Sequence, residues 1–418
     1  MQKPACYDER SRLLSPASSP AASGKQNNVM HGGCLATHPQ IIALYSYYLA
    51  IGAVIAITIH LFTIRVYHHH IDGISRHSVI ATFSVFSAYG RSSTLNTTNT
   101  VIRPGSIFVD ILGNPINAHG GGFLLHNGTY YWYGEIKTGA TYLPISNANW
   151  GGTRIDFVGI SCYKSVDLVN WEHRGNILPS PTSLENHNDL ASDKVVERPK
   201  VVYNEKTNKF VMWMHVDSMD YQLAKCGVAT SDHPDGPFDY ISSFRPDNGQ
   251  MCRDMTVFVD DDAKAYLFYS SEDNAVMHIS LLTDDYLSTT GTYSRIFIGR
   301  YMEAPTVFKR DGKYYFIGSG STAWEPNAAR SAVATASIWG PWIELGNPCR
   351  GKDANITFRS QSTYILPVGN RFIFIADRWN RHNLSDSRYV WLPLFFDGYT
   401  GHPLVRWHDE WSLDTWLA

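Results

Sequence analysis

Five segments of similar pattern recur along the chain, and this repeat constrains its fold more than any other feature. Each begins with polar residues, continues as an apolar strand, turns, and ends as an aromatic strand closed by a polar residue. The segments are 118–135, 195–217, 253–271, 302–320 and 359–379. Their starts lie about 50 to 80 residues apart, with little helical periodicity between them. This pattern predicts a five-bladed β-propeller, whereas a β-sandwich gives no reason for a fivefold repeat.

The repeat also brings polar side chains into register. Aligning the segments on their turns gives one shared position, occupied by His119, Glu197, Arg253, Glu303 and Ser360. Asp254 and Gln361 follow one residue later. The innermost strand of each propeller blade starts near the central channel, so equivalent positions converge on one axis. A single acidic residue on a strand would mean little, but several at one radius predict a carboxylate-lined axial pocket.

The first hundred residues differ in composition from the rest. Residues 1–40 are rich in Ser, Pro, Ala and Gly, which predicts a disordered tail. Residues 41–64 contain no Lys, Arg, Asp or Glu. At a rise of ~1.5 Å per residue they would span the ~30 Å hydrocarbon core as one transmembrane helix. A cleaved signal peptide fits less well, because the polar stretch before the apolar run is too long. Residues 65–100 are then a linker or stem, and residues 101–418 form the all-β propeller domain.

Glycosylation sequons and cysteines indicate on which side of the membrane the propeller lies. The four Asn-X-Ser/Thr sequons all follow the apolar segment, at Asn96, Asn127, Asn355 and Asn383. Four cysteines also follow the apolar segment, namely Cys162, Cys226, Cys252 and Cys349. An even number of cysteines predicts one or two disulfides in an oxidising compartment. We therefore expect a single-pass type II membrane glycoprotein of the secretory pathway, in the Golgi, with a lumenal catalytic domain.

Charge and motif spacing exclude several classes of partner. The formal net charge is −3, so the chain has no basic footprint for nucleic acid. No C-x-x-C spacing indicates a zinc site. The run Asp260-Asp261-Asp262 falls in a turn between strands and lacks the spacing of a calcium loop. We expect no metal and no required cofactor, and the sequence does not indicate a structural Ca²⁺.

Several short motifs carry a resemblance to a known family. They are AHGGG (118–122), YWYGE (131–135), VVERPKVVY (195–203), RDMTVF (253–258), MEAPTVF (302–308), ADRW (376–379) and SRYVWLPL (387–394). With them, residues 101–418 resemble glycoside hydrolase family 43, and more narrowly its exo-β-1,3-galactanase branch, subfamily 24. The resemblance implies a five-bladed propeller that removes galactose, with inversion, from the non-reducing end of β-1,3-galactan. Such galactans occur in the side chains of arabinogalactan proteins, so the expected partner is an oligo- or polysaccharide.

The resemblance assigns the acid of the reaction. Inverting hydrolysis needs a protonated acid at the leaving oxygen and a second group, about 6.5–9.5 Å away, that activates water. The family's proton donor maps to Glu303, whose pKa must be raised by burial or by neighbouring carboxylates. Asp254 is the candidate for tuning that pKa and for binding sugar hydroxyls. The alternative is that Asp254 forms only a local ion pair with Arg253.

The base stays open at this level. Most of family 43 has an Asp at the start of blade one, where this chain reads Asn117-Ala118-His119-Gly120. The galactanase branch shares this departure and places a Gln in blade five to orient water, through an imidic-acid tautomer; it maps to Gln361. Glu197 is a second essential carboxylate near the −1 sugar. Glu135 would bind hydroxyls or act as the base. The sequence does not choose among Gln361, Glu197 and Glu135.

Further side chains are candidates for contacts with the substrate. They are Glu135, His119, Tyr221, Ser321, Asp377 and Arg388, together with Trp324 and Trp379. Packing within the blades is the alternative for Tyr221, Ser321, Asp377, Arg388, Trp324 and Trp379, and a hydrogen bond to neighbouring backbone is the alternative for His119. Two other functions compete with the galactanase: an arabinofuranosidase or β-xylosidase, and a propeller that binds carbohydrate without turnover. The missing blade-one Asp speaks against the first, and the joint presence of Glu303, Glu197, Asp254 and Gln361 speaks against the second.

Overall fold

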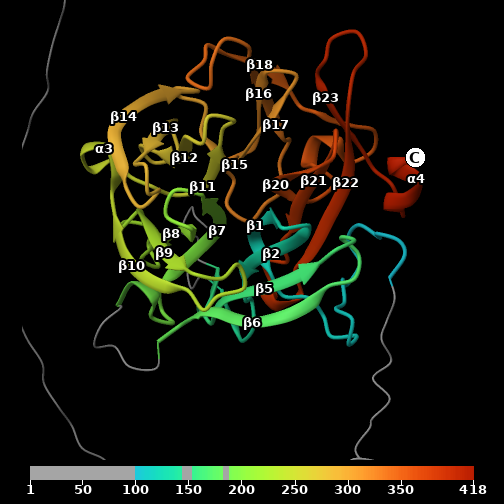
Figure 1. The fold of residues 1–418 in the computed structure, drawn as a ribbon. Helices are drawn as coiled ribbons and strands as arrows, with labels where there is room; N and C mark the ends of the chain where they lie inside the picture. The colour runs from blue at the N-terminus through green and yellow to red at the C-terminus, as the bar shows by residue number, and fades with distance from the viewer. Residues whose placement is uncertain (1–98, 144–152, 182–187) are drawn as a thin grey trace, which may run out of the picture. The chain divides into compact units, whose positions relative to one another are not determined.

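The computed structural model describes residues 99–143, 153–181 and 188–418. Five sheets surround a central axis, and they are antiparallel except for the parallel pair β19–β23 at the edge of one of them (Figure 1). The five-bladed propeller predicted from the repeat is therefore confirmed. The predicted tail, the transmembrane segment and nearly all of the stem lie outside the described residues. Within the described part, no helix has the length and apolar character needed to cross a membrane.

The first three blades each contain four strands that follow one another from the axis outward. Blade one consists of β1 (His119–His126), β2 (Thr129–Glu135), β5 (Gly159–Ser165) and β6 (Glu172–Pro179). Blade two consists of β7 (Val195–Asn204), β8 (Lys209–Asp217), β9 (Lys225–Ser231) and β10 (Asp239–Phe244). Blade three consists of β11 (Met255–Val259), β12 (Ala265–Ser271), β13 (Val276–Leu282) and β14 (Thr289–Ile296).

Blade five is larger than blade four. Blade four consists of β15 (Met302–Arg310), β16 (Lys313–Gly320), β17 (Arg330–Ala334) and β18 (Trp342–Gly346). Blade five adds a fifth, outermost strand and consists of β20 (Gln361–Val368), β21 (Arg371–Arg378), β22 (Arg388–Phe396), β23 (Pro403–Arg406) and β19 (Cys349–Arg350). The remaining elements are short: β3 (Thr141–Tyr142), β4 (Arg154–Ile155), α3 (Pro246–Gly249), α4 (Leu413–Leu417) and the 3-10 turns Asn188–Leu190, Ala354–Ile356 and Leu384–Asp386.

Apolar clusters between neighbouring blades close the ring. Five buried clusters each combine side chains of two adjacent blades. The cluster between blades one and five is rich in aromatics, including Trp132 and Trp391, whose ring centroids lie 4.8 Å apart. Ile102, before the first blade, pairs with Trp411, after the last. Blades one and five are thus held together by side-chain packing and by this backbone pair, so the axial positions stay at fixed distances.

A repeated backbone irregularity follows one side chain near the beginning of three inner strands. In β1, β7 and β15 the register shifts by one residue directly after His119, Glu197 and Glu303. The following residues, Gly120, Arg198 and Ala304, have φ of 61°, 58° and 52°. β-Bulges of this kind bend a strand and redirect a side chain, and strained backbone of this kind clusters at functional sites.

The bulges also correct the alignment made on the turns. Gln361 pairs with Asp377 as Glu303 pairs with Ser319, so Gln361 and not Ser360 is the blade-five equivalent. In blade three no register shift lies between the two inner strands, and Asp254 takes the corresponding place rather than Arg253. The absent bulge accounts for the one-residue difference in blade three. Blade five has a bulge of its own, between Ser362 and Tyr364, so the register of β20 with β21 identifies Gln361 there.

The structure shows the disulfide, the free cysteines and three of the four sequons of the propeller. Cys226 and Cys252 form a disulfide between β9 and the segment that leads into β11, so the expectation of one or two disulfides is confirmed. Cys162 and Cys349 are buried free thiols. Three sequon asparagines are exposed, and the fourth, Asn96, lies outside the described residues; the exposed ones are Asn127, Asn355 and Asn383.

Candidate active site

One cavity of about 420 Å³ lies where the five inner strands begin. Each blade supplies at least one polar side chain to its wall, and those that carry a carboxylate or an amide at the axis are Glu135, Glu197, Asp254, Glu303 and Gln361. The first comes from the end of β2 and the others from the beginnings of the inner strands or the residue before them. The expected convergence of carboxylates and an amide on one axial pocket is therefore confirmed.

Glu303 has the environment of a proton donor. Its Oε1 accepts hydrogen bonds of 2.8 Å from Asn274 Nδ2 and from Ser321 Oγ. Among the described residues, no group bonds to Oε2, so a proton on that oxygen is available to a ligand. Burial first, and then the negative charge of Asp254, raise the pKa of Glu303 to about 7. The carboxyl group can therefore stay protonated near neutral pH.

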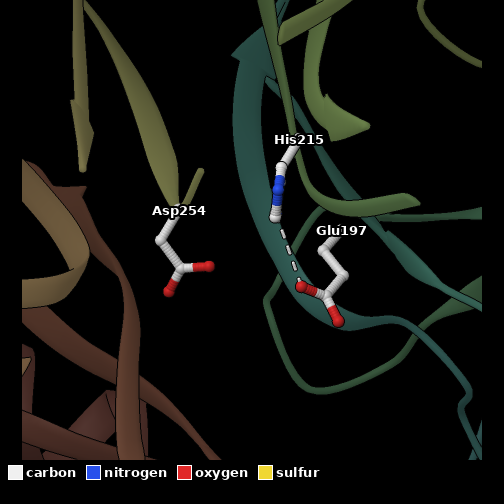
Figure 2. A group of neighbouring side chains, drawn as sticks. All are labelled: Glu197, His215 and Asp254. Atoms are coloured by element: carbon white, nitrogen blue, oxygen red, sulfur yellow. Dashed lines mark ion pairs between the residues drawn. The ribbon is translucent and has the colours of Figure 1, made fainter. Parts of the chain in front are cut away.

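Glu197 has the opposite environment. In β8 the residue opposite Glu197 is His215, whose Nδ1 lies 3.5 Å from Glu197 Oε2 (Figure 2). The other ring nitrogen, Nε2, lies 2.8 Å from Asp217 Oδ2. Burial alone would lower the pKa of His215, but the two carboxylates raise it to about 10. Burial would likewise raise the pKa of Glu197, but His215 and Lys137 outweigh it and lower that pKa. Glu197 is therefore an ionised carboxylate held beside an imidazolium.

Asp254 pairs with an arginine that the sequence did not single out. Its Oδ2 lies 2.8 Å from Arg198 Nη2 and accepts a 2.9 Å hydrogen bond from the Ala304 amide. Burial would raise the pKa of Asp254, and Arg198 more than offsets it, so the pKa is lowered. Arg253 instead pairs with Asp273 at 2.9 Å. The alternative of a local Arg253–Asp254 ion pair is therefore wrong.

The orientation of the Gln361 amide follows from its partners. Its Oε1 accepts hydrogen bonds from Arg198 Nη2 at 2.7 Å and from Trp379 Nε1 at 3.0 Å. Both partners can only donate, so this atom must be the oxygen. Its Nε2 donates to Ser319 Oγ at 3.0 Å, which leaves one N–H free for a ligand or water. In this arrangement the amide oxygen has no lone pair left for a proton, so Gln361 can position water by donating to it.

Glu135 closes the blade-one side of the cavity. It forms an ion pair with Lys137, and its Oε1 accepts a 3.2 Å hydrogen bond from the Arg198 amide. Burial raises its pKa to about 7, although Lys137 opposes the shift. The Lys137 ammonium lies 5.8 Å and 5.7 Å from the ring centroids of Trp324 and Trp379. Both rings line the cavity and so offer apolar faces on which a sugar can stack.

Three of the six predicted binding residues line the cavity, namely Glu135, Tyr221 and Ser321. His119 and Asp377 do not: they are buried and bond to each other at 3.0 Å, and His119 stacks on Tyr389. Arg388 is also outside the cavity wall and is engaged by Asp386. These three side chains therefore lie outside the cavity wall, with polar groups bonded to neighbouring residues, and their contact with the substrate stays a prediction.

The sequence analysis missed several groups that shape the site. Arg198 and Lys137 are buried cations next to named residues, and only their positions directly after Glu197 and near Glu135 could have drawn attention to them. His215 lies on β8, and it reaches Glu197 because the two are register partners. Asn274 comes from the β12–β13 turn. The repeat of the inner strands gives no information on His215, which lies on a second strand, or on Asn274, which lies in a turn.

The chemistry of one cluster can be tested for metal binding. Ligand atoms of Glu197, His215 and Asp254 lie within 4.8 Å of one another. A metal would need an imidazole nitrogen with a free lone pair, but the two His215 nitrogens lie 3.5 Å and 2.8 Å from carboxylate oxygens, toward which they donate. Arg198 already neutralises Asp254. These residues therefore do not fit a cation site.

Comparison with solved structures identifies close relatives of this propeller. A β-1,3-galactosidase of family GH43, solved with galactodeoxynojirimycin, is 42% identical with a TM-score of 0.68, over 75% of this chain and 100% of that chain. An exo-β-1,3-galactanase from Phanerochaete chrysosporium, solved with β-1,3-galactotriose, is 36% identical with a TM-score of 0.67, over 75% of this chain and 68% of that one.

Curated relatives are more distant. The β-D-galactofuranosidase xynD of Aspergillus niger is 26% identical over 225 residues, which are 52% of this chain and 64% of that protein. The chain thus spans less than two thirds of the length of this relative. Residues 123–360 match the family described as glycosyl hydrolases family 43. The repeat, the ring of five blades and the axial carboxylates agree with that match, and the chain belongs to glycosyl hydrolase family 43.

Proposed function

We propose that the protein is an inverting, exo-acting glycoside hydrolase that releases galactose from the non-reducing end of β-1,3-galactan. One observation carries this proposal: a single cavity holds Glu303 with its pKa raised to about 7 and Glu197 with its pKa lowered. Two carboxyl groups whose pKa values are driven apart are the requirement for paired acid and base catalysis. The substrate comes from the relatives, whose names give β-1,3-galactosidase and exo-β-1,3-galactanase activity.

In the proposed reaction Glu303 gives its proton to the glycosidic oxygen as the bond to the anomeric carbon breaks. A water molecule attacks that carbon from the opposite face of the ring. Gln361 holds the water through its free N–H, and Glu197, the carboxylate with the lowered pKa, accepts the water proton. Asp254 keeps the pKa of Glu303 high by its negative charge. The products are galactose with inverted configuration and a galactan shorter by one residue.

The test is the release of galactose from β-1,3-galactan by the full-length protein. We expect galactose as the sole early product, first as the α-anomer, which proton NMR detects before mutarotation. Release of arabinose or xylose from their aryl glycosides, with no galactose from galactan, would instead support an arabinofuranosidase or β-xylosidase. Tight galactan binding with no product would support a propeller that binds carbohydrate without turnover.

We further propose that the protein is a type II membrane glycoprotein with its propeller in the Golgi lumen. The charge-free segment 41–64, the Cys226–Cys252 disulfide and the exposed sequons at Asn127, Asn355 and Asn383 support this location. Treatment with a peptide N-glycosidase should reduce the apparent mass of the protein isolated from its host. Protease added to intact vesicles should leave the propeller uncut.

A further inference from the structure

A second cavity lies at the outer edge of blade five, away from the catalytic residues. Its volume is about 950 Å³, larger than that of the active site. One wall is the segment 350–359 between β19 and β20, and the other is β23 with the residues on both sides of it. We call this cavity the blade-five groove. Its volume suits a chain of sugar units better than a single small ion.

The blade-five groove is cationic in a protein of net negative charge. Five basic side chains line it, Arg350, Lys352, Arg359, Arg378 and Arg406, against three acidic ones, Asp353, Asp397 and Asp409. The chain as a whole has a formal net charge of −3. A local excess of positive charge inside a concave wall attracts anions more strongly than the same charges on a flat surface.

The fold already occupies two of the three carboxylates. Asp397 accepts hydrogen bonds from the backbone amides of Tyr399 and Thr400, and Asp409 accepts one from the Trp407 indole. In contrast, Lys352 and Arg406 form no ion pair with any residue in the described ranges 99–143, 153–181 and 188–418. Both of these side chains are exposed. The third carboxylate, Asp353, pairs with Arg359 at 3.6 Å. The five basic side chains still outnumber the three carboxylates, so the groove keeps a net positive charge.

Arg378 lies close to a second cation of the groove. Its Nη2 donates to the Phe358 carbonyl at 2.8 Å, and its guanidinium lies 5.3 Å from the Trp407 ring centroid. Burial and the nearby positive charge of Arg359 both lower the pKa of Arg378. The positive charges of Arg378 and Arg359 repel each other, and an anion bound in the groove would offset that repulsion.

The groove is connected by the chain to the catalytic cavity. Arg359 precedes Gln361 by two residues, and Arg378 directly precedes Trp379. The segment that carries Arg359 is held in an unusual conformation, with φ of 48°, 56° and 61° at Thr357, Phe358 and Arg359. Positive φ is rare for a β-branched residue such as Thr357, and backbone of this kind persists where the surrounding structure imposes it.

We propose that the blade-five groove binds a sugar unit that carries a negative charge, as a carboxylate or a sulfate, on the polysaccharide whose galactan end enters the active site. The proposal rests on the proposed function for the identity of the main chain. Guanidinium groups bind carboxylate and sulfate oxygens through paired N–H donors, and the Trp407 ring offers an apolar wall for the sugar. The preferred substrate is then an acidic galactan rather than a neutral one.

The test compares a charged polymer with its neutral parent. β-1,3-Galactan is partly oxidised at C6, which converts some galactose units to galacturonate, and a second portion is sulfated. Binding of each polymer to the full-length Glu303→Gln variant is measured by calorimetry. We expect at least one charged polymer to bind about tenfold more tightly than the neutral one, as a few exposed ion pairs allow. Raising NaCl from about 0.05 M to about 0.5 M should reduce this advantage.

The control variant is Lys352→Glu/Arg406→Glu, which reverses two charges of the groove away from the catalytic cavity. It should remove the preference for the charged polymers, while Arg406→Lys retains it. When Glu303 is kept, the Lys352→Glu/Arg406→Glu variant should hydrolyse neutral galactan at the same rate as the unaltered enzyme. Equal affinity for neutral and charged polymers, or a preference that survives in the double variant, would overturn the proposal. If the unaltered enzyme failed to hydrolyse neutral galactan, the result would count against the proposed function alone, because the binding of charged polymers is measured separately.

Discussion

Glu197 in blade two and Glu303 in blade four occupy equivalent places yet have opposite acidities. Each lies near the beginning of an inner strand, and each is followed by a residue with positive φ. The residue opposite Glu197 is His215, an imidazolium, whereas the residue opposite Glu303 is the neutral Ser319. The pKa of Glu197 is lowered and that of Glu303 is raised to about 7. The partner on the second strand therefore distinguishes the two roles.

The positions of Glu197 and Glu303 and their pKa values have different causes. The repeat and its bulge bring a side chain to the axis, and they do so equally for a base and an acid. The charge of the neighbours then decides which protonation state persists: His215 and Lys137 surround Glu197, while Asn274, Ser321 and the negative Asp254 surround Glu303. Substitution of either glutamate, or of one of its neighbours, therefore changes the acid and the base separately.

The largest effect is expected from Glu303→Gln. The amide cannot donate an acidic proton, so kcat on β-1,3-galactan should fall by about 10³-fold or more, within the range for loss of a general acid. An aryl galactoside with a good leaving group needs less protonation and should lose much less. The matched control is Glu344→Gln, an exposed blade-four residue paired with Arg300, which should leave both rates unchanged. Equal losses on both substrates would contradict the assignment of Glu303 as the acid.

Glu197→Ala should lower kcat by about 10²- to 10³-fold, because the attacking water loses its proton acceptor. Azide needs no base and fits the space left by the side chain, so it should restore turnover and yield galactosyl azide of inverted configuration. Mass spectrometry and NMR identify that product. The parallel Gln361→Ala variant loses only water positioning and should respond weakly to azide. Strong azide rescue of Gln361→Ala with none of Glu197→Ala would make Gln361 the base.

The sequence predicted the inner-strand part of the site and little of its surroundings. Glu303, Glu197, Asp254 and Gln361 could be named because the repeat aligns the beginnings of strands. The bond between Arg198 and Gln361 links blades two and five, and no local pattern encodes a contact over 163 residues. His215 depends on the β7–β8 register, which includes a bulge.

The same limits explain the misplaced binding residues. Asp377 is the register partner of Gln361, so a location at the axis was well predicted. Its carboxylate nevertheless bonds to His119 and to the Gly120 amide instead of facing the cavity. Strand position fixes where a residue lies, but the direction of its hydrogen bonds depends on neighbours from another blade. The tail, the membrane segment and the stem remain predictions.

A smaller effect is expected when the neighbour of Glu197 is changed and Glu197 is kept. In His215→Asn the imidazolium is lost, burial is no longer outweighed, and the pKa of Glu197 should rise. Because this carboxylate must be ionised to act, the acidic limb of the kcat/KM profile should move to higher pH, with about a tenfold loss on the acidic side. Asp217→Asn, which removes the other partner of His215, should give a smaller shift in the same direction. A pH-independent loss would indicate a structural role only.

The smallest effect concerns Ser321, which donates a hydrogen bond to Glu303 Oε1. This bond favours the ionised carboxylate and so lowers the pKa of Glu303, against the larger effect of burial. In Ser321→Ala the pKa should therefore rise above about 7. Activity requires the protonated acid, so the alkaline limb of the kcat/KM profile should move upward by a few tenths of a pH unit, about a twofold gain on that flank. Ser337→Ala, at a blade-four turn residue whose hydroxyl donates to the Gly340 carbonyl, is the matched control. An alkaline limb that moved downward would mean that Ser321 stabilises the protonated acid, and the contrast between the two glutamates would then need a different cause.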